Sequence, residues 1–244
     1  MIDFTLITAV DKYHLDELLK VWPTWIGYKK EILNCPVSII YDVNEIKDEE
    51  ISKMKHFLSD NKYLFFIPWE AEKNKYKNQR EKMLTALTLL PSRHIKTEWF
   101  LKIDTDTYAT NDKEWIQDDW FQNDICFVTN KWRYTKPANA LEILDNWADN
   151  VDVLKERPRL NMPYNPEWSR VCHRRIISWL FFCRTGWSKN AVSFIENKKL
   201  PIPSQDTFLW YIATRLGYKY KTVGFKNLGW QHSNKNIRKW EIKQ

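Results

Sequence analysis

The sequence predicts an α/β fold with a mainly parallel central sheet flanked by helices and an irregular C-terminal lobe. Short apolar, β-branched segments alternate with segments of helical period along the first half of the chain. Their lengths suit βαβ units, whose strands run parallel. No linker, repeat or low-complexity tract divides the 244 residues, so we expect one two-lobed domain over 1–244.

The first half is the more regular. The expected strands are Phe4–Val10, Pro36–Tyr41, Tyr63–Ile67 and Trp99–Ile103. Helical spacing marks one helix by Leu15, Leu18, Leu19 and Trp22, and another by Ile51, Met54, Phe57 and Leu58. A third helix is expected over 78–90, because good helix formers continue until Pro91.

The second half predicts strands at 124–129, 176–183 and 218–223, with helices near 138–147, 191–197 and 207–216. Residues 151–175 carry proline and arginine and are expected to be loop-rich. Connections of this length sometimes close over a ligand.

Glycine is scarce: the chain has five, where average usage gives about 17. Neither G-x-G-x-x-G nor G-x-x-x-x-G-K-[ST] occurs. A bound nucleotide would therefore need its phosphates neutralised by something other than a glycine-rich loop.

The net charge of +7 is concentrated near the C-terminus, where residues 217–244 hold seven basic residues against Glu241 alone. Such a segment suits a polyanion, whether nucleic acid, an anionic membrane surface or a phosphorylated glycan. The alternative is a solvated basic tail.

Four cysteines form no C-x-x-C pair, so neither a zinc ribbon nor a redox motif is indicated. Cys35, Cys126 and Cys183 lie in or beside apolar runs and are expected to be buried thiols. No apolar stretch has the length of a membrane span, and the start does not look like a signal peptide. We expect a soluble, cytoplasmic protein.

Asp104-Thr105-Asp106 directly follows an apolar strand, at the end where open α/β sheets bind ligands. On an extended chain the two carboxylates would share a face about 6–7 Å apart. Two ligands of one Mg²⁺ lie about 3 Å apart, so unless the chain turns only one carboxylate would bind metal directly. The alternative is an Asx turn with solvated acids.

Two later segments add to this signal. Ser204-Gln205-Asp206 precedes a predicted helix, and Trp230-Gln231-His232 lies near the end of the chain. By itself Asp206 would be a helix-capping acid, and His232 a surface or core histidine. A functional role is favoured for both residues because they follow Asp104-Thr105-Asp106 in this order along the chain.

In these features the chain resembles the GT-A family of nucleotide-sugar glycosyltransferases. The resemblance rests on Asp11 and Asp42 at two strand ends, Arg80, the D-x-D of Asp104 and Asp106, an x-E-D-like Ser204-Gln205-Asp206, and His232. Gln205 departs from the usual Glu, and Gly186 alone stands for a glycine-rich segment.

The resemblance implies a nucleotide-sugar-binding half over 1–110 and an acceptor-binding half over 111–244. The implied donor is a nucleoside-diphosphate sugar, with a UDP-sugar expected, bound by Ala9, Val10, Asp11, Asp42, Arg80 and Asp104. Asp104 would reach the ribose or a metal-bound water. Asp106 and His232 would hold Mn²⁺ or Mg²⁺, with the imidazole favouring Mn²⁺. Asp206 would be the general base of an inverting transfer.

Acceptor contacts are expected from Trp187, Trp230 and Arg174, because indole rings stack on sugars and bases. One acceptor class is DNA with a hydroxymethylated pyrimidine, as in virus-encoded DNA glycosyltransferases, which requires base extrusion. The other is a bacterial surface glycan or lipid-linked sugar.

Two other kinds of protein remain as alternatives to a glycosyltransferase. A sugar nucleotidyltransferase shares the scaffold and paired carboxylates but usually opens with a glycine-rich basic loop, which is absent after Val10. A non-catalytic nucleic-acid-binding module would explain the charge and the tryptophans, but not the D-x-D at a strand end.

Overall fold

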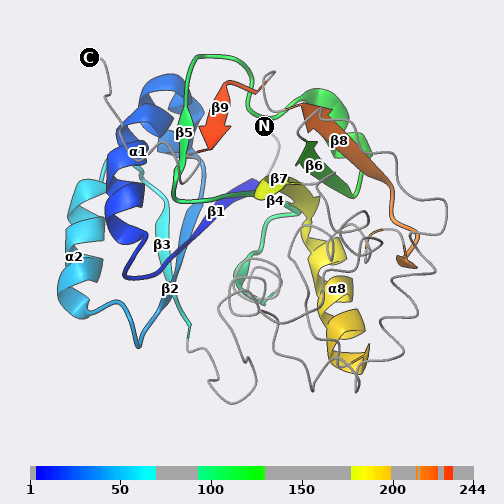
Figure 1. The fold of residues 1–244 in the computed structure, drawn as a ribbon, viewed down its shortest axis with the longest axis horizontal. Helices are drawn as coiled ribbons and strands as arrows, with labels where there is room; N and C mark the ends of the chain where they lie inside the picture. The colour runs from blue at the N-terminus through cyan, green and yellow to red at the C-terminus, as the bar shows by residue number, and fades with distance from the viewer. Residues whose placement is uncertain are drawn as a thin grey trace, which may run out of the picture.

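A computed structural model describes residues 4–69, 93–129, 177–198, 213, 215–224 and 228–232. Within these ranges, seven strands form a central sheet in the order β3-β2-β1-β4-β7-β6-β8. Four of its six neighbouring pairs are parallel, and the two that involve β7 are antiparallel. The expected mainly parallel α/β sheet is confirmed (Figure 1).

The N-terminal part of this sheet consists of β1 (Phe4–Val10), β2 (Val37–Asp42) and β3 (Leu64–Trp69). Helices α1 (Leu15–Tyr28) and α2 (Asp48–Phe57) connect these strands and lie beside each other on the sheet (Figure 1). The 3-10 helix η1 (Lys30–Asn34) follows α1. An ion pair of 3.7 Å between Lys53 and Asp16 links the two helices on their exposed side.

The apolar spacing of α1 explains its packing. Its buried side chains recur on one face and join β1 and β2 in the core; they are Leu15, Leu18, Leu19, Val21, Trp22 and Trp25. Helix α1 and the sheet therefore share one hydrophobic core, which holds the carboxyl ends of β1 and β2 in place.

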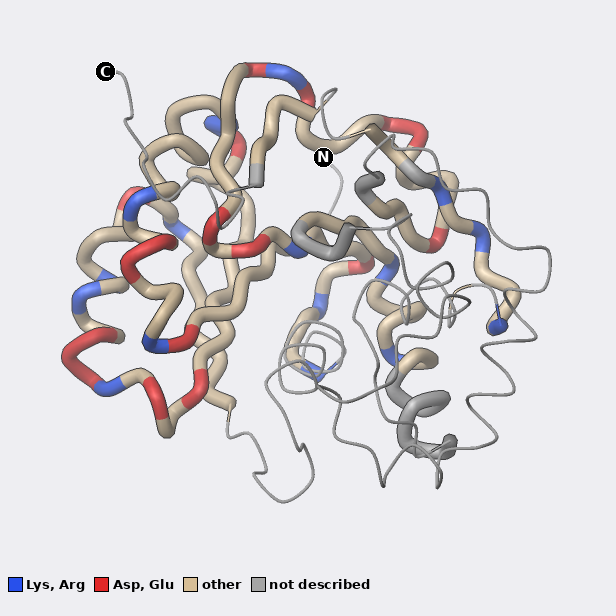
Figure 2. Tube along the Cα trace, viewed as in Figure 1, with Lys and Arg blue, Asp and Glu red and all other residues tan. Residues whose placement is uncertain are grey.

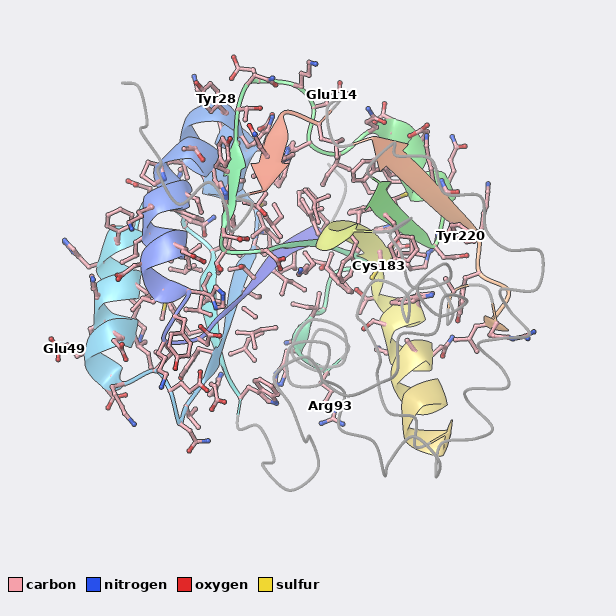
Figure 3. The ribbon with its side chains drawn as sticks, in the orientation of Figure 1. Tyr28, Glu49, Arg93, Glu114, Cys183 and Tyr220 are labelled. Atoms are coloured by element: carbon pink, nitrogen blue, oxygen red, sulfur yellow. The ribbon has the colours of Figure 1, made fainter. Side chains whose placement is uncertain are left out.

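The rest of the sheet consists of β4 (Trp99–Ile103), β7 (Ile177–Arg184), β6 (Ile125–Thr129) and β8 (Tyr220–Gly224). Every residue of β4 is buried, as expected of a strand between β1 and β7. Helix α8 (Thr185–Lys198) follows β7 directly, and the 3-10 helix η3 (Asp118–Gln122) precedes β6. Figure 3 shows Cys183 on β7 among closely packed side chains, and Cys35 and Cys126 are buried too, as predicted.

Two short strands lie outside the central sheet. β5 (Thr107–Ala109) follows β4 after a turn, and β9 (Trp230–His232) pairs with it in antiparallel fashion. The sequence analysis predicted neither strand. The helix expected at 191–197 begins earlier, at Thr185. The helices expected at 78–90 and 138–147, most of 207–216, and the segment 151–175 lie outside the described residues.

Candidate functional site

Three neighbouring strands end in acidic residues at the same edge of the central sheet. Asp42 ends β2, Asp11 follows β1, and Asp104 follows β4; these strands are adjacent in the order β2-β1-β4 and run parallel. Carboxyl ends of parallel strands are where open α/β sheets bind ligands. The fold thus gathers predicted donor-binding residues from three parts of the sequence.

Ala9 and Val10 lie on the same strand end as Asp11. The Val10 side chain belongs to the hydrophobic core, so this residue would offer a ligand only its backbone. Ala9 is half-buried and pairs in register with Ile40 on β2.

Asp11 is a buried carboxylate with several donors. Its Oδ1 accepts hydrogen bonds from the backbone N–H of Tyr13 (2.8 Å) and of His14 (3.0 Å), and lies 2.6 Å from His14 Nδ1. Burial opposes ionisation, but the hydrogen bond and charge of His14, with the two backbone donors, outweigh it and lower the pKa of Asp11. Asp11 is therefore ionised, and in this form its carboxylate holds the backbone that leads into α1.

His14 is a residue of this edge that the sequence analysis missed. Its hydrogen bond to Asp11 raises the pKa of the imidazole above its ordinary value; burial acts in the opposite direction, and the charges of Asp11, Glu17 and Asp106 add to the increase. The contribution of Asp106 means that His14 lies within electrostatic reach of the D-x-D. In the sequence, this pair is marked by a histidine that comes three residues after an aspartate at the end of a strand.

Asp42 shapes the loop after β2. Its Oδ1 accepts a hydrogen bond from the backbone N–H of Asn44 (2.9 Å), and its carbonyl accepts from Glu45 (3.0 Å) and Ile46 (2.9 Å). This is the Asx-turn arrangement by which aspartate ends a strand. The loop after β2 is thereby held at the same edge as Asp11.

The chain turns at the D-x-D, which corrects the extended geometry expected from the sequence. The backbone N–H of Thr107 donates to the carbonyl of Asp104 over 3.1 Å, closing a four-residue turn. The distance of about 6–7 Å between the two carboxylates, expected for an extended chain, therefore does not apply. The connection from β4 to β5 crosses the middle of the molecule in Figure 1, and Figure 2 shows acidic residues on it.

Asp104 also has a partner that the sequence analysis missed. The Nζ of Lys102 forms an ion pair with Asp104 Oδ1; the lysine side chain is 0% exposed and that of Asp104 is 29% exposed. Residues two apart on a strand share a face, so a lysine within an apolar strand, two positions before the D-x-D, was the signal available.

The strand β9 brings residue 232 to the D-x-D turn. In the β5–β9 pair Thr107 is in register with His232, and Ala109 with Trp230. The backbone N–H of Thr110 extends the pairing by donating to the carbonyl of Gly229 over 2.7 Å. The backbone of His232 therefore lies opposite the residue that follows Asp106.

Helix α1 anchors this small sheet. Trp25 Nε1 donates to the carbonyl of Thr107 over 2.6 Å, and the Thr24 hydroxyl accepts from the backbone N–H of Ala109 over 3.1 Å. The buried Lys29 ammonium donates to the carbonyls of Asn111 and Lys113. In Figure 3, Tyr28 at the end of α1 and Glu114 in the loop after β5 lie at the same end of the molecule. These contacts hold β5 against α1, and β5 in turn holds the D-x-D turn that precedes it.

Trp187 and Trp230 lie in the core, so the expected acceptor contacts are not supported by their position. Trp187 is 1% exposed and Trp230 is 2% exposed; the Trp230 ring packs edge-on against Trp25 at 5.9 Å and beside Trp115 at 6.3 Å. Enclosed rings have no open face for a sugar or base. Packing accounts for much of the tryptophan content, since the buried set also contains Trp22, Trp99 and Trp120.

Several predicted site residues lie outside the described part of the chain: Arg80, Arg174, Asp206 and most of the basic segment after Gly224. Among the residues that are described, no helix is long and apolar enough to cross a membrane.

No protein-family model matches the chain, and no curated protein matches it. Solved structures are similar in fold. The mannosyltransferase Ktr4p from S. cerevisiae has 13% identity and a TM-score of 0.57, over 95% of this chain and 70% of that one. Core-mannan synthase A from Aspergillus fumigatus, in its Mn/GDP form, has 11% identity and a TM-score of 0.58, over 95% and 75%.

A nucleoside-diphosphate-sugar pyrophosphorylase from Vibrio cholerae is also similar, with 10% identity and a TM-score of 0.54, over 94% of each chain. At these identities the likeness establishes the fold. The order of the strands, the acidic edge and these neighbours together show that the chain has an α/β fold of the GT-A type.

Proposed function

We propose that this protein is a nucleotide-sugar glycosyltransferase whose donor site is the acidic edge of the central sheet. One observation carries the proposal: the β5–β9 pair brings His232 opposite Thr107, directly after the D-x-D turn. The register thus joins two backbone segments that lie more than a hundred residues apart in the sequence, beside the turn that follows β4. The Mn/GDP form of one solved neighbour supports a nucleotide and a divalent cation as ligands.

The donor's nucleoside would lie against the ends of β1 and β2. There Ala9 and Val10 offer backbone groups, and Asp11 and Asp42 are held by turn hydrogen bonds. Asp104 would contact the ribose or a metal-bound water. Arg80 would add positive charge near the phosphates. We propose a UDP-sugar as donor, with a GDP-sugar as the alternative that two GDP-bound neighbours suggest.

Asp106 and His232 would hold the divalent cation, Mn²⁺ or Mg²⁺. Carboxylate and imidazole donors suit these ions. Within the described residues no group of three or more His, Cys, Asp or Glu side chains could hold a metal by itself. The proposed ion would complete its coordination with donor phosphates and water. When bound, it would stabilise the charge of the departing nucleoside diphosphate.

Asp206 would act as the general base that removes a proton from the acceptor hydroxyl as this attacks the anomeric carbon. A single displacement of that kind inverts the configuration at the anomeric carbon. The proposed acceptor is a hydroxymethylated pyrimidine in DNA, near Arg174 and the basic C-terminal segment; a surface glycan or lipid-linked sugar is the alternative.

A sugar nucleotidyltransferase is the second candidate, favoured by the pyrophosphorylase that matches over 94% of both chains. The loop after β1 argues against it. Only Asp11-Lys12-Tyr13-His14 separates β1 from α1, and hydrogen bonds to Asp11 close this loop tightly, leaving no glycine-rich basic segment for a triphosphate.

A panel of nucleoside diphosphates, with and without Mn²⁺, tests the donor site by thermal shift. We expect one nucleotide to raise the melting temperature by several degrees, and only with the metal. Asp106→Asn should abolish this shift and lower donor hydrolysis roughly 100-fold or more. Asp60→Asn, a matched change in the exposed loop after α2, should leave both unchanged. Equal behaviour of the two variants would exclude Asp106 as a ligand of the metal.

The acceptor is tested by incubation with a nucleotide-sugar and either hydroxymethylated or plain duplex DNA. Transfer to the hydroxymethylated duplex alone supports the DNA acceptor. Absence of both transfer and salt-dependent DNA binding would overturn it. Release of pyrophosphate from a nucleoside triphosphate and a sugar 1-phosphate would instead identify a nucleotidyltransferase.

A further inference from the structure

Lys102 is a charged residue in the interior of the central sheet. It lies on β4, in register with Ile7 on β1 and Phe181 on β7, and its strand neighbours Leu101 and Ile103 are fully buried. Its Nζ lies 5.7 Å from the centroid of the Phe181 ring. A buried ammonium is costly unless it is paired, so its partner identifies what it does here.

Lys102 is paired with the first carboxylate of the D-x-D. Lys102 Nζ forms an ion pair with Asp104 Oδ1, while 29% of the Asp104 side chain remains exposed. The ion pair holds the carboxylate in one orientation, because the lysine side chain is fully buried. It also offsets one of the two negative charges that the D-x-D presents.

We propose that Lys102 is a positioning residue that holds Asp104 towards the donor and cancels its charge, so that the site takes up a divalent cation as its complex with a nucleoside diphosphate and binds the free ion only weakly. This inference rests on the proposed function. In that complex the ion would take its remaining ligands from the phosphates and water. The phosphates then supply the negative charge and the ligands that the protein withholds.

The test measures Mn²⁺ binding without turnover, by electron paramagnetic resonance of the free ion and by calorimetry. The probes are Mn²⁺ alone and Mn²⁺ with UDP or GDP. The wild-type protein should bind Mn²⁺ alone weakly and the Mn²⁺–nucleotide complex well. Lys102→Met removes the positive charge that pairs with Asp104, so it should tighten binding of Mn²⁺ alone by roughly three- to tenfold. The same variant should weaken binding of the complex by roughly tenfold, because Asp104 is no longer held.

These opposite changes separate a positioning role from a structural one, since general destabilisation would weaken both. The matched control is Lys53→Met, which removes the lysine of the exposed Lys53–Asp16 pair and should change neither affinity. Equal affinities for Lys102→Met and wild type, or weakening of both, would overturn the inference.

A second pair of variants decides the question if Lys102→Met does not fold. Asp104→Asn removes the negative charge from the Lys102–Asp104 pair and should weaken binding of Mn²⁺ alone. The double variant Lys102→Met/Asp104→Asn replaces both charges with neutral groups and should restore that affinity to the wild-type value. An equal loss in the single and double variants would contradict charge cancellation. If the wild-type protein binds no Mn²⁺–nucleotide complex at all, it is the proposed function that fails.

Discussion

Thr107 and His232 face each other across the antiparallel pair of β5 and β9. Because Thr107 directly follows Asp106, this register brings the C-terminal Trp-Gln-His segment to the D-x-D turn. Helix α1 fixes the same place from the other side, through the hydrogen bond from Trp25 to the Thr107 carbonyl. The candidate metal site therefore depends on a contact between two three-residue strands, which the first two predictions examine.

Gly229 is the position where β9 is most sensitive to substitution. Its φ is +61°, and a Cβ there would lie 2.2 Å from Asn111 Oδ1. We expect Gly229→Ala to lower the free energy of unfolding by about 1–3 kcal/mol and to weaken the metal-dependent nucleotide shift. In the control Gly27→Ala, at an exposed position of α1, none of the described residues lies within 4 Å of the added Cβ. It should be neutral or stabilise by up to about 1 kcal/mol. Equal unfolding curves for the two variants would contradict this account.

Trp25 and Trp22 offer a matched pair on one helix. Both are buried, but the Trp25 indole donates to Thr107, whereas the Trp22 Nε1 has no hydrogen-bond partner in the part of the chain that is described. Trp25→Phe should therefore cost about 1–2 kcal/mol more than Trp22→Phe in chemical unfolding. It should also weaken the nucleotide shift, because β5 loses its anchor. A larger effect of Trp22→Phe on that shift would refute the anchoring role.

The Asp11–His14 pair predicts a pH window of stability. The pKa of Asp11 is lowered, so its contribution is present above the ordinary value of 3.8 and is lost as pH falls through the folded value. The pKa of His14 is raised, so its contribution is present below 6.5 and is lost as pH rises through the folded value. Wild type should exceed His14→Gln in stability most clearly between about pH 4 and 6.5. The difference should be about 1 kcal/mol or less, because His14 is partly exposed.

Unfolding titrations from pH 3 to 9 measure this window. The control His56→Gln removes an imidazole from an exposed position on α2. A stability difference for His14→Gln that is constant across the whole range would show that the pair does not titrate with folding.

The described cysteines should be inert in the native protein. Burial raises the pKa of Cys35 and of Cys126 to about 12, and raises that of the enclosed Cys183 well above its ordinary value. In a Cys172→Ser variant, a thiol reagent at pH 8 should label these three side chains only after unfolding. Rapid labelling of the native variant would mean that the interior of the sheet opens easily.

Much of the fold could be predicted from the spacing of apolar residues. Phe4–Val10 and Trp99–Ile103 are strands with the predicted bounds, and α1 lies where the helical spacing of its leucines indicated. These elements bury a face whose period is visible in any short window of sequence. The acidic edge could be predicted too, because Asp11, Asp42 and Asp104 each lie at the carboxyl end of a strand that runs parallel to its neighbour.

The sequence by itself determined the strands of the central sheet, helices α1 and α2, and which carboxylates end the strands, because these follow from local hydrophobic period and from the geometry of parallel sheets. Only the tertiary structure decided the turn at Asp104, the buried partner Lys102, the enclosure of Trp187 and Trp230, and the pairing of β5 with β9. A three-residue strand such as Trp230–His232 has too little sequence to carry a period. Its conformation is fixed by a partner strand more than a hundred residues earlier and by the helix behind it.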